Sequence, residues 1–146
     1  MCNINAIICP KGKTIRALDI SFLEQTSAIS YNTNSDGEGA FFNGTGKIIK
    51  QNEKIRYLEH HKDILASSIV ITHQRLSTSG KTKEYHHPFE NEDFVFVHNG
   101  VMPTFVKESA SDTHGVFTQL CETFSTSTTP EREDRIIEAI KKVFDD

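Results

Sequence analysis

Cysteine is scarce in this sequence. The three that are present, Cys2, Cys9 and Cys121, are an odd number, and no two of them have the Cys-x-x-Cys spacing of a zinc ribbon. This pattern argues against a disulfide framework and against a structural zinc site, because both need cysteines in matched sets. We therefore expect free thiols and a protein that stays in a reducing compartment, the cytoplasm.

Basic clusters and long hydrophobic runs are also missing. The 16 Lys and Arg residues are dispersed and are outnumbered by 20 Asp and Glu, whereas surfaces that bind nucleic acid select basic patches. The apolar stretches are too short to span a bilayer, and the first residues lack the charged and apolar regions of a secretion signal. The sequence therefore predicts a protein that binds neither nucleic acid nor a membrane.

What is present indicates one globular α+β domain over residues 1–146. The hydrophobic share of 36% is enough for a sizeable core, and neither an internal repeat nor a long linker divides the chain. Short apolar runs ended by turn residues predict strands, and apolar residues at helical spacing predict helices. The expected strands lie at 3–9, 40–42, 48–49, 69–71 and 94–97, and the expected helices at 19–30, 54–66, 111–124 and 130–144.

The most informative residue is Cys2, which becomes the first residue once Met1 is removed. We expect that removal because cysteine is small. A free thiol is only slightly ionised at neutral pH, so a base within hydrogen-bond reach is needed. The α-amino group of the same residue can serve, because the ordinary pKa of such a group is about 8. The alternative is that Cys2 is a small apolar residue of the first strand, as free cysteines often are.

Three short segments carry further polar groups, and each has two interpretations. Arg75, just after a buried strand, suits a carboxylate ligand, or it forms a structural salt bridge. Asn99 and Gly100 suit a developing oxyanion, or they form a hairpin turn. Asp112 lies within Ser111-Asp112-Thr113, which also reads as the capped start of a helix.

Taken in order, these segments form a larger pattern. Residues 73–80 satisfy the form H-x-R-x-[AS]-T-x-G, and residues 98–100 read H-N-G. Together with Cys2 they resemble the class II glutamine amidotransferase domain, the N-terminal-nucleophile glutaminase of glucosamine-6-phosphate synthase, amidophosphoribosyltransferase, asparagine synthetase and glutamate synthase. The segments that carry the resemblance are Cys2, SDGEG, HQRLSTSG, HHPF, FVFVHNGVM and SDT, which span positions 2 to about 124.

The resemblance implies a set of catalytic residues. Cys2 would attack the side-chain amide of glutamine, and its own α-amino group would act as the base. The side-chain amide of Asn99 and the backbone N–H of Gly100 would stabilise the tetrahedral oxyanion. His73 and His98 flank these motifs, and we expect both to be structural hydrogen-bonding residues because the mechanism already has a base.

The resemblance also implies a set of substrate-binding residues. Arg75, with Thr78 nearby, would bind the α-carboxylate of glutamine, and Asp112 would bind its α-ammonium group. A metal site and a cofactor are not expected. The adjacent pair His86-His87 does not change this, because neighbouring side chains on a strand point to opposite faces.

The fold implied by the resemblance is the four-layer αββα sandwich of antiparallel sheets found in N-terminal-nucleophile hydrolases. Members of the family continue into further strands after the second late helix, so we expect a version shortened at the C-terminal end. The family passes ammonia to a synthase domain, and the sequence has no glycine-rich nucleotide-binding loop. We therefore expect a separate synthase subunit, or a homo-oligomer, as the partner of a glutamine-hydrolysing chain.

Two other functions stay open on the sequence. An N-terminal-nucleophile hydrolase of different specificity would keep Cys2 and Asn99 but cut another amide, although Arg75, Thr78 and Asp112 match a free amino acid. A non-catalytic relative with a truncated fold would bind glutamine, as a binding or regulatory subunit, without turning it over.

Overall fold

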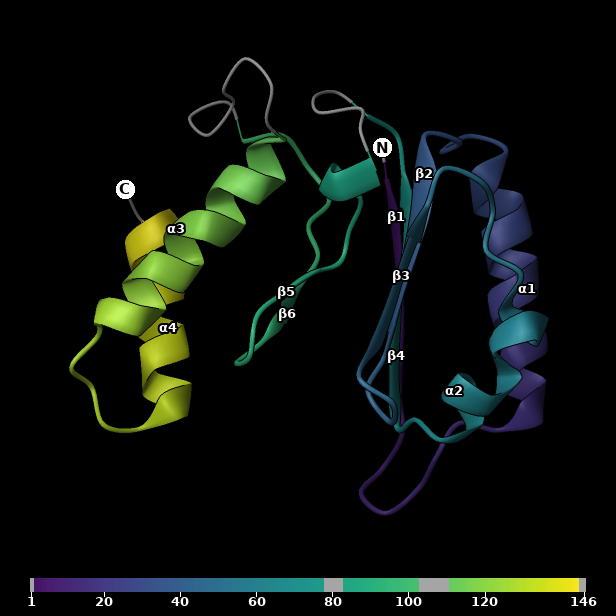
Figure 1. Cartoon of the computed structure of the whole chain (residues 1–146), viewed down its shortest axis with the longest axis horizontal. Coiled ribbons are helices and arrows are strands. Elements are labelled where there is room, and N and C mark those ends of the chain that lie inside the picture. The colour runs from purple at the N-terminus through teal and green to yellow at the C-terminus, as the bar shows by residue number, and fades with distance from the viewer. Residues whose placement is uncertain (1, 78–82, 103–110, 145–146) are drawn as a thin grey trace.

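The protein folds as a mixture of helices and antiparallel strands (Figure 1). The structure, a computed structural model, describes residues 2–77, 83–102 and 111–144. The α+β class expected from the sequence is confirmed. The strands are β1 (Asn3–Ile8), β2 (Gly37–Phe42), β3 (Lys47–Gln51), β4 (Ile69–Arg75), β5 (Phe89–Glu90) and β6 (Val95–Phe96); the helices are α1 (Ala17–Tyr31), α2 (His61–Leu65), α3 (Asp112–Thr126) and α4 (Arg132–Phe144); and the 3-10 turns are η1 (Tyr57–His60) and η2 (Lys83–Tyr85).

Strands β1 to β4 form one antiparallel sheet in the order β1-β4-β2-β3. The register of β1 against β4 places Asn3 opposite Gln74 and Ile8 opposite Ile69. Successive side chains alternate between the two faces of the sheet, and α1 and α2 cover one face (Figure 1). The buried apolar core on that side consists of Ile15, Ile20, Leu23, Ala40, Phe42, Ile55, Tyr57, Ile64 and Val70.

The second half of the chain lies on the other face of this sheet. The hairpin of β5 and β6 comes next to the sheet, and α3 and α4 lie beyond the hairpin (Figure 1). The layers therefore run helix, sheet, sheet, helix, although β5 and β6 have only two residues each. None of the helices in the described ranges has the length and apolar character to cross a membrane. The buried residues that hold α3 against α4 are Val116, Leu120, Phe124, Ala139 and Val143.

A buried carboxylate, Glu38, links several elements of the first core. One of its oxygens accepts hydrogen bonds from the Ser27 hydroxyl at 2.8 Å and from the Ile55 backbone N–H at 2.7 Å. Its other oxygen accepts from the Tyr57 hydroxyl at 2.7 Å and from the side-chain amide of Gln74. A buried charge is costly unless hydrogen bonds satisfy it, and here four donors do so. Glu38 therefore joins α1, β4 and the segment before α2 to the centre of the sheet.

The same carboxylate explains why the expected helix at 54–66 is wrong in its first half. The structure has an extended residue at Arg56, then η1 and the short helix α2. The N–H of Ile55 is bound to Glu38, and the N–H of Leu58 donates to the carboxylate of Glu24 at 2.9 Å. Glu38 anchors Ile55 in the core ahead of the first turn. The Leu58 N–H, which would donate to the Lys54 carbonyl in a helix begun at residue 54, is bound by Glu24 instead, so helical structure begins only at η1.

Two glycines of β2 allow the sheet and the second half of the chain to approach closely. A Cβ atom on Gly39 would overlap with the backbone carbonyl of His87, and a Cβ atom on Gly37 would overlap with the imidazole of His86. Gly37 also has a φ of +148°, a conformation that side chains rarely adopt. The SDGEG and HHPF segments singled out in the sequence are therefore packed directly against each other.

We expect Gly39→Ala to lower the free energy of unfolding by about 2–3 kcal/mol, because the added methyl group meets backbone atoms that cannot turn aside. Urea denaturation measures this loss. Gly46→Asn is the matched control, since its Cβ position is open and asparagine tolerates the φ of +64° found there. An equal, small loss for both variants would contradict the close packing of β2 on His87.

Candidate functional site

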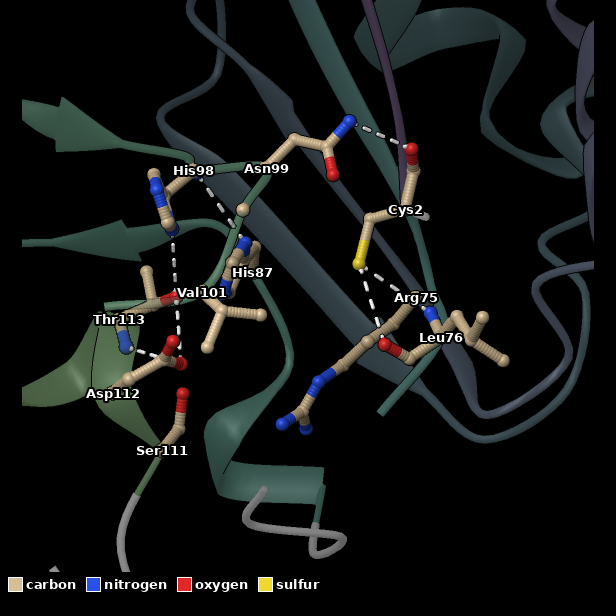
Figure 2. A pocket seen from close by; sticks show the side chains of 11 residues that line it. Cys2, Arg75, Leu76, His87, His98, Asn99, Val101, Ser111, Asp112 and Thr113 are labelled. Carbon is tan, nitrogen blue, oxygen red and sulfur yellow. Dashed lines mark hydrogen bonds between the residues drawn. The ribbon is translucent and has the colours of Figure 1, made fainter. Parts of the chain in front are cut away.

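A pocket of about 140 Å³ lies where the first sheet meets the second half of the chain (Figure 2). Sites for drug-sized ligands are typically about 300–1,000 Å³, so this pocket suits a smaller metabolite. Every site residue expected from the sequence lines it, except Thr78, which lies outside the described residues. The lining consists of Cys2, Arg75, Leu76, His87, His98, Asn99, Gly100, Val101, Ser111, Asp112 and Thr113.

Cys2 lies immediately before β1, with its sulfur against the backbone of Leu76. The Leu76 N–H donates to Sγ at 3.4 Å, and the thiol donates to the Leu76 carbonyl at 3.5 Å. The pairing of Asn3 with Gln74 creates this contact, because it brings the start of β1 to the end of β4. The residue is partly exposed, so a ligand in the pocket can reach its thiol.

Asn99 follows β6 and reaches across to Cys2. Its Nδ2 donates a hydrogen bond of 2.8 Å to the Cys2 backbone carbonyl (Figure 2). A side-chain amide nitrogen carries two hydrogens, so this contact uses one of its two donor positions. The structure thus brings the expected oxyanion residue to the expected nucleophile. The contact is to the backbone of Cys2 and not to its thiol.

Arg75 is the last residue of β4 and is only 4% exposed. Its guanidinium extends from the sheet into the pocket (Figure 2). One terminal nitrogen donates to Nδ1 of His86 at 3.3 Å. Burial lowers the pKa of Arg75, and the nearby side chains of Cys2 and Asp112 act against that shift. A buried cation therefore shares this pocket with the Cys2 sulfur and the Asp112 carboxylate.

Asp112 is the first residue of α3, where the helix dipole favours a negative charge. Its Oδ2 accepts the N–H of Met102 at 2.7 Å, and its Oδ1 accepts the N–H of Thr113 at 2.8 Å. The side chain of Ser111, the N-cap residue, forms no capping hydrogen bond. These contacts hold the Asp112 carboxylate in a fixed place at the pocket wall.

Buried histidines surround this pocket and are held neutral. Burial is the main cause that lowers the pKa of His73 to about 3 and of His86 to about 4, and it also lowers the pKa of His87 far below its usual range. The rings of His73 and His87 lie against each other, with their centroids 4.0 Å apart and their planes tilted by 38°. His98 pairs through Nδ1 with the Thr113 hydroxyl at 3.2 Å. Among the described residues, no three His, Cys, Asp or Glu side chains gather to hold a metal ion.

Sequence reasoning missed two residues that contact the site from outside the pocket. His86 binds Arg75, and Asn52 in turn binds His86, with its Oδ1 2.9 Å from Nε2. His86 stands in the HHPF segment and in the His86-His87 pair, but no role in the site was expected for it. Asn52 lies in a polar stretch far from any of the recognised segments, so nothing in the sequence pointed to it.

Comparison with protein-family models gave no match, and comparison with curated proteins gave none. The chemistry open to the protein follows from the side chains that line the pocket. The pocket brings a thiol, a buried guanidinium and a fixed carboxylate together from three parts of the chain. Such a set can attack a carbonyl carbon and hold a molecule that carries both a positive and a negative charge.

We expect the free energy of unfolding to fall as the pH drops from 6.5 to 4.5. His73 and His86 have folded-state pKa values of about 3 and about 4. The unfolded chain therefore binds more protons in this window, and stability that is complete above pH 6.5 is lost on acidification. Each such histidine contributes about 1 kcal/mol per pH unit.

Chemical denaturation at a series of pH values measures this slope. His86→Asn should make it shallower, whereas His61→Asn, a change at an exposed histidine, should leave it unchanged. A flat profile between pH 6.5 and 4.5 would show that these histidines are not buried in their neutral form.

Proposed function

We propose that this protein is a glutaminase of the class II amidotransferase type, which hydrolyses the side-chain amide of glutamine to glutamate and ammonia. The observation that carries the proposal is the composition of the pocket wall. Arg75 and Asp112 are the only Arg, Lys, Asp or Glu side chains among its lining residues in the described part of the chain, and Cys2 lines the same pocket. One cation, one anion and one nucleophile match the three groups of glutamine that need recognition.

The two charged residues give the substrate its orientation. The α-carboxylate of glutamine would bind Arg75, whose planar guanidinium suits a carboxylate, and the α-ammonium group would bind Asp112. Thr78 is proposed to assist at the carboxylate. Fixing both ends of a zwitterion limits the positions that its side-chain amide can take, and such positioning lowers the barrier of the next step.

Cys2 would then carry out the chemistry, after removal of Met1. The α-amino group takes the thiol proton, and the sulfur forms a bond to the amide carbon of glutamine. Collapse of the tetrahedral intermediate breaks the C–N bond, and the proton goes to the departing ammonia. Water then hydrolyses the γ-glutamyl thioester, which releases glutamate and restores the thiol. The overall balance is glutamine plus water to glutamate plus ammonia.

Asn99 and Gly100 would stabilise the oxyanion of the tetrahedral intermediate. One hydrogen of the Asn99 amide holds the Cys2 carbonyl, and the other is proposed to face the oxyanion. The N–H of Gly100 would be the second donor. A donor of this kind typically contributes about 3 kcal/mol to the stabilisation of the transition state. The contact between Asn99 and Cys2 supports this role because it fixes the donor relative to the nucleophile.

The finer fold assignment belongs to the same proposal. The order helix, sheet, sheet, helix in Figure 1 supports a four-layer αββα sandwich of the N-terminal-nucleophile hydrolase type. Ammonia is proposed to pass to a separate synthase subunit, with a homo-oligomer as the other arrangement, in the cytoplasm. Ammonia transfer to an acceptor by this chain alone would count against a separate synthase.

The first test is covalent labelling with a glutamine-like diazo ketone, read by intact mass. We expect a single adduct on a chain that lacks Met1, together with release of glutamate from glutamine by the unlabelled protein. Cys2→Ala should lose both, whereas Cys9→Ala should keep both, because Cys9 does not line the pocket. Retained Met1 without an adduct, combined with a melting temperature raised by glutamine, would favour the non-catalytic binding protein instead.

The second test concerns the charge at the α-ammonium subsite. Asp112→Asn keeps an oxygen to accept the Met102 N–H but removes the negative charge. A hydrogen bond to a charged group contributes about 1.5–3 kcal/mol, so we expect kcat/KM for glutamine to fall by about 10- to 100-fold, mainly through KM. Asp134→Asn, on the exposed side of α4, is the control and should leave kcat/KM unchanged. Equal kinetics for both variants would remove Asp112 from the substrate site.

A further inference from the structure

Arg75 is contacted by a histidine whose hydrogen-bonding state can be assigned. Arginine has only donors, so Nδ1 of His86, 3.3 Å from the guanidinium, must accept. The other ring nitrogen, Nε2, lies 2.9 Å from Oδ1 of Asn52, which is also an acceptor. The ring therefore has its hydrogen on Nε2 and its lone pair on Nδ1. This is the neutral tautomer in which His86 bridges Arg75 and Asn52.

The surroundings of His86 leave this arrangement little freedom. The ring is 1% exposed and lies directly on the backbone of Gly37, where even a methyl group would overlap with it. Asn52 is itself anchored, because its backbone carbonyl accepts the Tyr31 hydroxyl at 2.6 Å. A chain of contacts thus runs from the end of α1 through Asn52 and His86 to the guanidinium of Arg75.

We infer that His86, fixed in its Nε2–H tautomer by the donors of Arg75 and held at Nε2 by Asn52, is a positioning residue that orients the Arg75 guanidinium for a carboxylate in the pocket. The inference rests on the proposed function. A neutral acceptor differs from a carboxylate at the same place in one important respect. It fixes the direction of the guanidinium without cancelling its positive charge, so the charge remains effective toward the substrate.

The kinetic test compares glutamine with glutaminamide, in which a neutral amide replaces the α-carboxylate. His86→Leu removes the acceptor, so we expect kcat/KM for glutamine to fall by 10-fold or more, through KM. For glutaminamide, which gives the guanidinium no carboxylate to bind, we expect less than a threefold change. His86→Asn should restore much of the loss for glutamine, since its Oδ1 can accept in place of Nδ1. His61→Leu, at an exposed histidine, is the control.

Nitrogen NMR of the imidazole rings tests the tautomer without any turnover. We expect the Nε2–H form for His86 in the unmodified protein and also in Asn52→Leu, because the donors of Arg75 still need the lone pair of Nδ1. An Nδ1–H form in the unmodified protein, or equal losses for glutamine and glutaminamide in His86→Leu, would overturn the inference. Absence of glutaminase activity in the unmodified protein would instead refute the proposed function, so the two failures are distinguishable.

Discussion

The close approach of β2 to the His86-His87 segment is the constraint on which the site depends. The pocket has two walls, one from the ends of β1 and β4 and the other from residues 98–101 after β6 together with the start of α3. They can meet only because Gly37 and Gly39 present bare backbone to the two histidines. A wider spacing would draw His86 away from Arg75 and would separate Asn99 from Cys2, which it holds by a 2.8 Å hydrogen bond. The contact of β2 with His86 and His87 therefore fixes both the packing between the layers and the positions of the side chains in the pocket.

Glu38, the residue between Gly37 and Gly39, has its side chain on the opposite face of the sheet and stabilises the core there. Side chains alternate along a strand, so Glu38 points away from the pocket and into the core beneath α1. Its hydrogen bond with Gln74 fixes β4 one residue before Arg75. Gln74 in turn accepts from the side-chain amide of Asn3 at 3.3 Å, next to Cys2. The Glu38 network thus holds the backbones next to both Cys2 and Arg75 from the buried face of the sheet.

Strands β1 to β4 and β6, and the expected site residues that the structure describes, could be predicted because each leaves a local signal in the sequence, whereas the two-residue β5 could not. Apolar runs such as Ile69-Val70-Ile71 mark the strands, and Cys2, Arg75, Asn99 and Asp112 fall within short recognisable segments. Contacts between segments leave no such signal. The early part of the expected 54–66 helix is lost to hydrogen bonds with Glu24 and Glu38, whose positions become relevant only after folding. Asn52 and His86 act on Arg75 across the layers, so sequence spacing says nothing about them.

The neutral histidines explain how a small pocket can present two opposite charges selectively. Each charged histidine near Arg75 would add a second positive centre and would draw a carboxylate ligand away from the guanidinium. Burial prevents this at His73, His86 and His87, whose lowered pKa values keep the rings uncharged at neutral pH. In turn, the positive charge of Arg75 lowers the pKa of all three rings further. The arginine and its histidine surroundings therefore reinforce each other. The positive charge stays on the guanidinium, while His86 and His87 supply hydrogen bonds and all three rings shape the surroundings.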